Sequence, residues 1–323
     1  MLAAVVVVGG VVVVASGALP HPSSAAAATR PESGAGTEVD VRSHWFRMSR
    51  VLHERVVPNQ SNYAARSSAT GPLLLFLPAT GHQPRDYTRF LGLAAADGYH
   101  VLGLDYWNLG HSVASTCGKD AGCYGALQQN RFDGSHPFPK SSVAPRNSVL
   151  GRLKPALSYL RRSDPSGGWG RYLNGDSVRW NRVVLAGHSQ GGGESAYIAH
   201  IRSVEGVLLF GSPIISDGTT SATWLSSPSK TPSSRIYAFD NTSDQFWPRI
   251  EPSWRRLGLG APQVVDGTTH YSSHALISEV HQAHAHMWML DDATPKDAAG
   301  VPVYQPVWNW MLERFLPGPT ARA

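Results

Sequence analysis

One short stretch of the chain has the residue types and spacing of a nucleophile site. Residues 182–196 read RVVLAGHSQGGGESA, a short apolar run followed by GHSQG at 187–191. This pentapeptide fits the pattern G-x-S-x-G, in which a serine lies on a sharp turn between a strand and a helix. Glycine on both sides avoids a collision of side chains, and the turn lifts the serine Oγ clear of the sheet. Ser189 is therefore the predicted nucleophile, and a structural Gly-rich turn is the alternative.

A serine nucleophile needs a histidine base and an acid that orients the base. In a strand–turn–helix site, the acid and then the histidine follow the serine along the chain. After the apolar run RIYAF at 235–239 come Asp240 and Asp244. Asp244 is preferred because it lies in the loop beyond the strand, where an acid can reach a histidine. Asp240 is the alternative acid and Asp217 a third candidate, and turn formation is the competing explanation for each.

Two histidines follow the last predicted strand, in DGTTHYSSH at 266–274. His274 is preferred as the base because it lies at the start of a predicted helix, which would fix its ring. Ser272 and Ser273 before it are candidate helix caps. His270, nearer the strand, is the alternative base, and the histidine that is not used is expected to be an exposed loop residue.

Two backbone N–H groups must stabilise the negative oxygen that forms when a serine attacks an acyl carbon. One belongs to Gln190, the residue after the nucleophile and the start of a helix. The other comes from the loop after the first predicted strand, LPATGH at 77–82, and is assigned to Thr80. An ordinary turn closed by Gly81 is the alternative explanation of this loop.

A run of histidines near the C-terminus has some features of a metal site. His281 and His284 in HQAHAHMW would share a helix face, but His286 would not. No nearby acidic residue completes a ligand set, so the polar face of a helix is the better explanation and no metal is expected.

Aromatic residues are plentiful, with ten Trp in the chain. Trp107, Trp247 and Trp254 follow strand ends or lie near the acid loop, so they are expected to line a substrate groove. Core packing accounts for most of the others.

Short apolar runs alternate with helical patterns, which predicts a mostly parallel sheet with helices on both faces. The predicted strands are 73–77, 100–104, 182–186, 206–210, 235–239 and, more weakly, 261–265. The predicted helices are 85–97, 148–162, 191–201, 275–290 and 302–315. Ligands of such sheets bind at the carboxyl ends of the strands, where the candidate residues fall. The long segment 106–147 begins at such an end and is predicted to form a lid or pocket wall.

The N-terminal residues and the cysteines both indicate export. An apolar run from Leu2 to Ala15, followed by small residues, is typical of a secretory signal, with cleavage near Ala28. No Lys or Arg precedes the run, and a retained membrane anchor is the alternative. Cys117 and Cys123 are predicted to form one local disulfide, as expected of an exported protein.

The distribution of charge argues against a nucleic-acid partner. The chain of 323 residues carries a formal net charge of +5. Its Lys and Arg residues are spread along the sequence without a basic block, so no nucleic acid is expected to bind.

Taken together, these segments resemble the α/β-hydrolase superfamily. LLLFLPATGHQP is similar to its oxyanion strand and loop, AGHSQGG to its nucleophile elbow, FDNTSD to its acid turn and the segment at 266–274 to its base loop. The resemblance extends from Pro72 to the C-terminus. More narrowly, the chain is similar to secreted bacterial hydrolases of unassigned substrate that share a GLDYWN strand end and a cysteine pair after it. It departs from the commonest pattern at Asn241, where glycine is usual, and in having two candidate histidines.

The sequence predicts a signal peptide at 1–28 and an N-terminal extension at 29–71, and the resemblance implies an α/β-hydrolase domain at 72–323 with an insertion at about 106–147. It also implies a secreted, monomeric serine hydrolase that cleaves an ester or related acyl bond in a small-molecule or polymeric substrate. An acyl-enzyme would form on Ser189, with no cofactor and no stable membrane insertion. An acyltransferase or peptidase with the same residues is the alternative activity. A non-catalytic surface-binding protein on a hydrolase scaffold is the alternative from another class.

Overall fold

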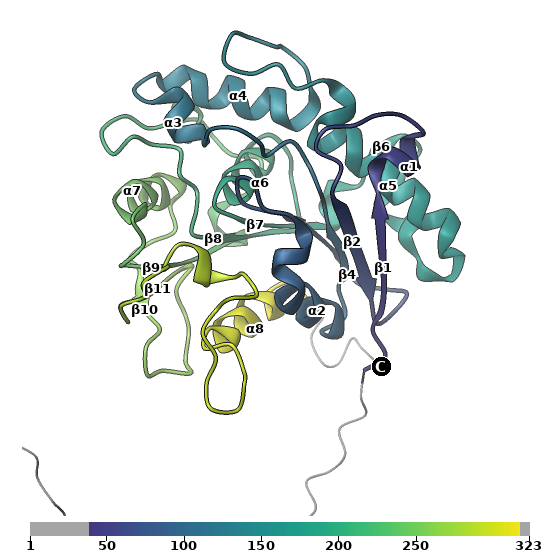
Figure 1. Cartoon of the computed structure of the whole chain (residues 1–323). Coiled ribbons are helices and arrows are strands. Elements are labelled where there is room, and N and C mark those ends of the chain that lie inside the picture. Colours follow the sequence, from purple (N-terminus) through teal and green to yellow (C-terminus); the bar gives the residue numbers. More distant parts are fainter. Residues whose placement is uncertain (1–38, 317–323) are drawn as a thin grey trace, which may run out of the picture. The chain divides into compact units, whose positions relative to one another are not determined.

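A nine-stranded sheet forms the centre of the computed structural model, which describes residues 39–316 (Figure 1). The strand order is β1-β2-β4-β3-β7-β8-β9-β11-β10. The strands from β4 to β10 in this order are parallel, whereas β1 and β2 are antiparallel to their neighbours. The bounds are β1 Arg42–Arg47, β2 Ser61–Arg66, β3 Leu73–Leu77, β4 His100–Gly103, β7 Val183–His188, β8 Gly206–Phe210, β9 Ile236–Asn241, β10 Gln263–Val264 and β11 Ala275–Ser278. A separate hairpin pairs β5 Leu173–Asn174 with β6 Ser177–Val178.

Helices cover both faces of the sheet, and this explains why its central strands are apolar throughout. Along β3, Leu73, Leu75 and Leu77 belong to one core and Leu74 and Phe76 to the other. The first core includes residues of α1 Met48–Leu52, α3 Val113–Cys117, α4 Ala121–Asp133, α5 Val149–Ser163, α6 Gln190–Ile201 and α7 Trp247–Leu257. The second includes residues of α2 Thr88–Ala96 and α8 Gln305–Glu313, which lie together below the sheet in Figure 1. The predicted α/β class with a mostly parallel central sheet is confirmed.

The sheet extends into the segment that was predicted to precede the domain. Strands β1 and β2 lie within residues 29–71 and continue the sheet beyond β4. The predicted signal peptide at 1–28 lies outside the described residues. In the part that is described, residues 39–316, no helix is both long and apolar enough to cross a membrane.

The predicted helix at 275–290 is wrong, and the error affects the site. Residues Ala275–Ser278 form β11, a fully buried strand between β9 and β10. The run ALIS is too short for periodicity to separate a buried strand from one turn of a helix. As a result His274 lies at the amino end of a strand, and the residues after Ser278 lie at the carboxyl edge of the sheet.

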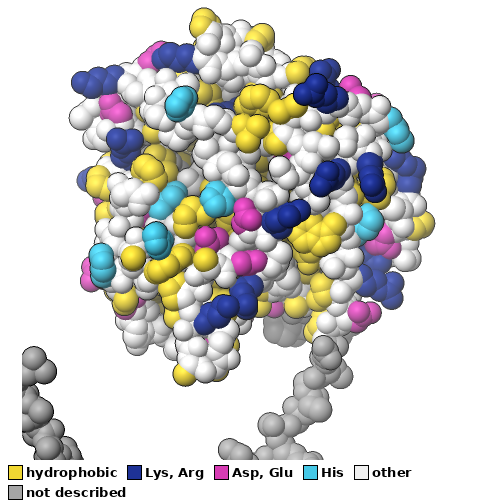
Figure 2. Space-filling model, viewed as in Figure 1, with side chains coloured by type: hydrophobic (Ala, Val, Ile, Leu, Met, Phe, Trp, Pro, Cys, Tyr) yellow, Lys and Arg dark blue, Asp and Glu magenta, His cyan; other side chains and the backbone are white. Residues whose placement is uncertain are grey.

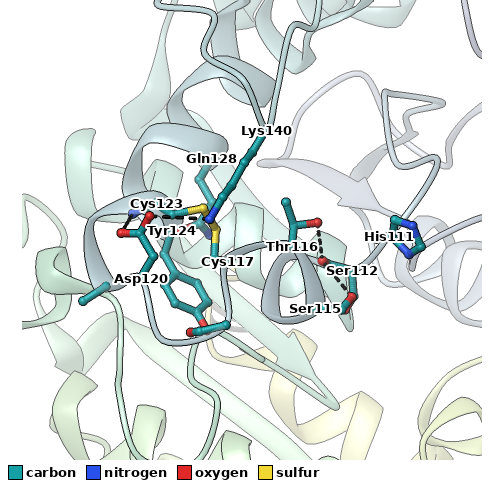
Figure 3. The surroundings of a disulfide bond; sticks show 12 residues. His111, Ser112, Ser115, Thr116, Cys117, Asp120, Cys123, Tyr124, Gln128 and Lys140 are labelled. Carbon is teal, nitrogen blue, oxygen red and sulfur yellow. Dashed lines mark hydrogen bonds and ion pairs between the residues drawn. A yellow bond between two sulfur atoms is a disulfide. The ribbon is translucent and has the colours of Figure 1, made fainter.

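The segment 106–147 contains two helices joined by a disulfide. Cys117 ends α3, Cys123 lies in the first turn of α4, and the two are bonded, as predicted (Figure 3). Asp120 accepts a hydrogen bond from the Cys123 N–H and so caps α4, and it also pairs with Lys140 at 3.5 Å. Because only five residues separate the cysteines, the disulfide fixes the local α3–α4 corner.

Candidate active site

Ser189 lies on the sharp turn between β7 and α6, at the carboxyl edge of the sheet. Its backbone has φ 54° and ψ −117°, a conformation that residues other than glycine rarely adopt. A Cβ on Gly187 would overlap the backbone of Gly191, and a Cβ on Gly191 would overlap the carbonyl of Leu77. Both glycines are therefore required by the close approach of β7, α6 and β3 around the serine.

A histidine and an aspartate form a hydrogen-bonded chain with Ser189. His286 Nε2 lies 2.8 Å from Ser189 Oγ, and His286 Nδ1 lies 2.6 Å from Asp244 Oδ2. The second carboxylate oxygen of Asp244 accepts the Phe246 N–H at 2.7 Å. The side chains of Ser189, His286 and Asp244 are all buried, and the most exposed of them, Ser189, is only 8% exposed. The geometry is that of a hydroxyl whose proton can pass to an imidazole held by a carboxylate.

The histidine beside Ser189 is thus His286, and the prediction of His274, with His270 as the alternative, is corrected. His274 Nδ1 bonds the carbonyl of Ile236 at 2.9 Å, and its ring stacks on Tyr237 with centroids 4.3 Å apart. Both contacts lie at the amino ends of β9 and β11, the length of a strand away from the carboxyl edge. His270 is exposed in the loop between β10 and β11.

In the sequence, His286 stands out only as a member of a histidine run. The run follows β11, and Figure 2 shows several histidine side chains on the face over the loops near β9 and β11. His281 and His284 are exposed; His281 lies near Ser243, and His284 packs on Trp288. Among residues 39–316 no group of His, Cys, Asp and Glu has the arrangement of a metal site. The signal that identifies His286 is its place after the buried run ALIS, once that run is assigned as a strand.

Two carboxyl groups lie together at the end of β9, and Asp244 is the one that contacts His286. Asp240 is fully buried, and its Oδ1 accepts the Asn241 N–H at 2.8 Å. Burial, and then the charge of Asp244, raises the pKa of Asp240 well above its usual value. A neutral Asp240 avoids placing two like charges side by side in a buried site.

The third candidate acid, Asp217, takes part in a turn. Its carboxylate accepts the backbone N–H groups of Thr219 and Thr220 at 2.8 and 2.6 Å. Turn formation, the competing explanation in the sequence, accounts for this residue.

The two residues predicted to supply oxyanion donors lie side by side. Thr80 Oγ1 donates to Gln190 Oε1 at 2.9 Å, which holds the loop after β3 against the start of α6. Two residues of the GLDYWN segment fix that loop: Tyr106 donates to the Pro78 carbonyl at 3.0 Å, and Asn108 donates to the Ala79 carbonyl at 2.6 Å.

The tryptophans near the site differ in exposure. Trp254 is buried and donates its ring N–H to the Ser212 carbonyl at 2.7 Å, so it packs in the core and does not line a groove. Trp107 and Trp247 are partly exposed. Phe246 packs edge-on against the ring of His286, with centroids 4.8 Å apart.

A buried carboxyl group and a guanidinium lie close together behind the nucleophile, between α6 and α4. Glu194 is fully buried, and its Oε1 lies 3.8 Å from Arg131 Nη1. Neither carboxylate oxygen of Glu194 has a hydrogen-bond partner within the described residues. Burial raises the pKa of Glu194 to about 8, against an ordinary value of 4.5.

This shift predicts a pH-dependent stability. The folded protein retains a proton on Glu194 that the unfolded chain releases above pH 4.5. The contribution of Glu194 to the free energy of unfolding is therefore complete below pH 4.5 and is lost as pH rises to about 8. Glu194→Gln cannot ionise, so we expect the wild type to lose stability relative to this variant as pH rises through that window. Urea unfolding of both proteins across the window measures the difference. Glu279→Gln, at an exposed site, is the control, and a wild-type-to-variant difference that is constant with pH would contradict the prediction.

Comparison with known proteins does not identify the chain. No protein-family model matches it, and a search of curated proteins finds no related protein. The case for a function therefore depends on the geometry around Ser189.

Proposed function

We propose that the protein is a serine hydrolase of the α/β-hydrolase superfamily that cleaves an ester or related acyl bond. The observation that carries the proposal is the buried chain from Ser189 Oγ through His286 to Asp244, with contacts of 2.8 and 2.6 Å. The serine lies on a strand–turn–helix corner, as in a nucleophile elbow, and the acid and then the histidine follow later strands in the chain order of this superfamily.

In the proposed reaction Ser189 Oγ attacks the acyl carbon while His286 Nε2 takes the hydroxyl proton. Asp244 orients His286 and stabilises the imidazolium that forms. The backbone N–H groups of Gln190 and Thr80 stabilise the developing oxyanion. His286 then gives its proton to the leaving group, and water releases the acyl group from Ser189 with His286 again acting as base.

Export of the protein is part of the proposal. The Cys117–Cys123 disulfide supports it, since disulfides persist mainly in oxidising compartments.

Labelling with a fluorophosphonate probe tests the proposed function, because such probes react with activated serines. We expect the folded wild type to be labelled at Ser189 and the Ser189→Ala variant not to be labelled. Ser243→Ala is the matched control, a serine in the neighbouring acid loop that should leave labelling intact. An unlabelled wild type, or a Ser189→Ala variant that is still labelled, would overturn the proposal.

A further inference from the structure

The residue before the nucleophile, His188, is completely buried and is bonded at both ring nitrogens. Its Nδ1 lies 3.0 Å from the Tyr87 hydroxyl, and its Nε2 lies 2.7 Å from the backbone carbonyl of His286. His188 therefore contacts the main chain of the very residue whose ring contacts Ser189.

The direction of each hydrogen bond follows from its partner. A carbonyl oxygen only accepts, so His188 Nε2 carries the hydrogen, and in a neutral ring Nδ1 must accept the Tyr87 O–H. The Tyr87 oxygen in turn accepts the Ala79 N–H at 3.4 Å. Burial lowers the pKa of His188 well below its ordinary value, in agreement with a neutral ring. Three consecutive hydrogen bonds, all donated in the same direction, thus run from Ala79 through Tyr87 and His188 to His286.

This series joins three parts of the candidate site that come from different strands. Ala79 precedes Thr80 in the loop after β3, His188 ends β7, and His286 lies in the loop after β11. The space beside the two rings is limited, because a Cβ on Gly211 would lie 3.2 Å from His286 Nδ1 and 3.4 Å from His188 Nε2.

We propose that His188 is a positioning residue that fixes the main chain of His286 and so holds its ring against Ser189. The proposal rests on the proposed function, because the ring of His286 matters to chemistry only if Ser189 is a nucleophile. His286 lies on a loop, and its ring bonds define its orientation only if its backbone is anchored. A displacement of about 1 Å at a reacting group can cost about 10²-fold in rate.

Two amide variants separate the two ends of the His188 ring. The amide nitrogen of His188→Gln can take the place of Nε2 and donate to the His286 carbonyl, whereas the shorter His188→Asn reaches only toward Tyr87. We expect His188→Asn to lower the rate constant of fluorophosphonate labelling by about 10²-fold, while His188→Gln recovers most of it. Both variants should still reach complete labelling, because a loss of positioning slows reaction at Ser189 without reducing the number of folded sites.

A second readout does not depend on activity. The proton on His286 Nδ1, bonded to Asp244, gives a far-downfield NMR signal that Asp244→Asn identifies by removing it. We expect the signal in the wild type and in His188→Gln, and its weakening by solvent exchange in His188→Asn. If His188→Asn folds poorly, Tyr87→Phe is the second variant: it removes only the hydroxyl donor to Nδ1, keeps the bond from His188 Nε2 to the His286 carbonyl, and should label at close to the wild-type rate. A loss of about 10²-fold in Tyr87→Phe would overturn the role given to the Nε2 bond.

The possible failures are distinguishable. Three outcomes would overturn the role of His188. The first is that both His188 variants are labelled at the wild-type rate, and the second is that His188→Asn and His188→Gln lose the same amount. The third is that the wild type gives no far-downfield NMR signal. A wild type that is unlabelled but shows the expected NMR pattern would overturn the proposed hydrolase function and leave the anchoring of His286 in place.

Discussion

Replacing His286 with Ala is expected to lower kcat/KM for a reactive ester by a factor of about 10⁴ to 10⁶. The reason is that Ser189 Oγ would lose the imidazole that lies 2.8 Å away and that takes its proton in the proposed reaction. His274→Ala is expected to keep near-wild-type activity, because His274 bonds the Ile236 carbonyl at the opposite edge of the sheet. The measurement is steady-state hydrolysis of a chromogenic ester.

A thermal unfolding curve for each variant provides the control, since His274 also packs on Tyr237 and its loss can reduce stability. The activity is therefore normalised to folded protein. A collapse in His274→Ala together with an active His286→Ala variant would show that the base is not the histidine beside Ser189.

Replacing Asp244 with Asn is expected to lower kcat by about 10⁴-fold. Asn keeps the shape of the side chain but presents no negative charge to His286 Nδ1, which lies 2.6 Å from the native carboxylate, so the imidazolium loses its counter-charge. Asp240→Asn is the matched variant and should have a small effect, because an amide oxygen can still accept the Asn241 N–H and it is Asp244, not Asp240, that contacts His286.

The two variants share one chemical change at positions four residues apart, so steady-state kinetics on the same ester compares them directly. Equal losses in both would mean that Asp240 is ionised and acts together with Asp244. A large loss in Asp240→Asn alone would reverse the assignment of the acid.

Local sequence was enough to predict the elements that hold the nucleophile. The run VVLA ends at a glycine and is followed by small residues, so β7, the turn at Ser189 and α6 could be predicted without knowledge of any other part of the chain. The Cys117–Cys123 pair was predictable for the same reason, since the two cysteines are close in sequence.

The histidine partner could not be predicted in this way because its position depends on a strand of four residues. β11 is defined by its neighbours β9 and β10 more than by its own pattern, and ALIS fits a helix equally well. A helix in that segment would give His274 a position at the helix start and would place His286 on a polar helix face. Strands β1 and β2 were missed for a related reason: they are antiparallel additions at the edge of the sheet, and exposed residues interrupt the apolar pattern of β1.

The backbone of Ser189 has a consequence for how this protein can change under selection. A non-glycine residue at φ 54° and ψ −117° costs on the order of 1–3 kcal/mol, which glycine at the same position would largely avoid. Selection for heat resistance alone would therefore favour replacing the one residue whose hydroxyl the proposed reaction requires. At position 189, glycine would favour stability, whereas the proposed activity requires serine. A thermostability screen of this chain must therefore also select for activity if it is to retain the serine.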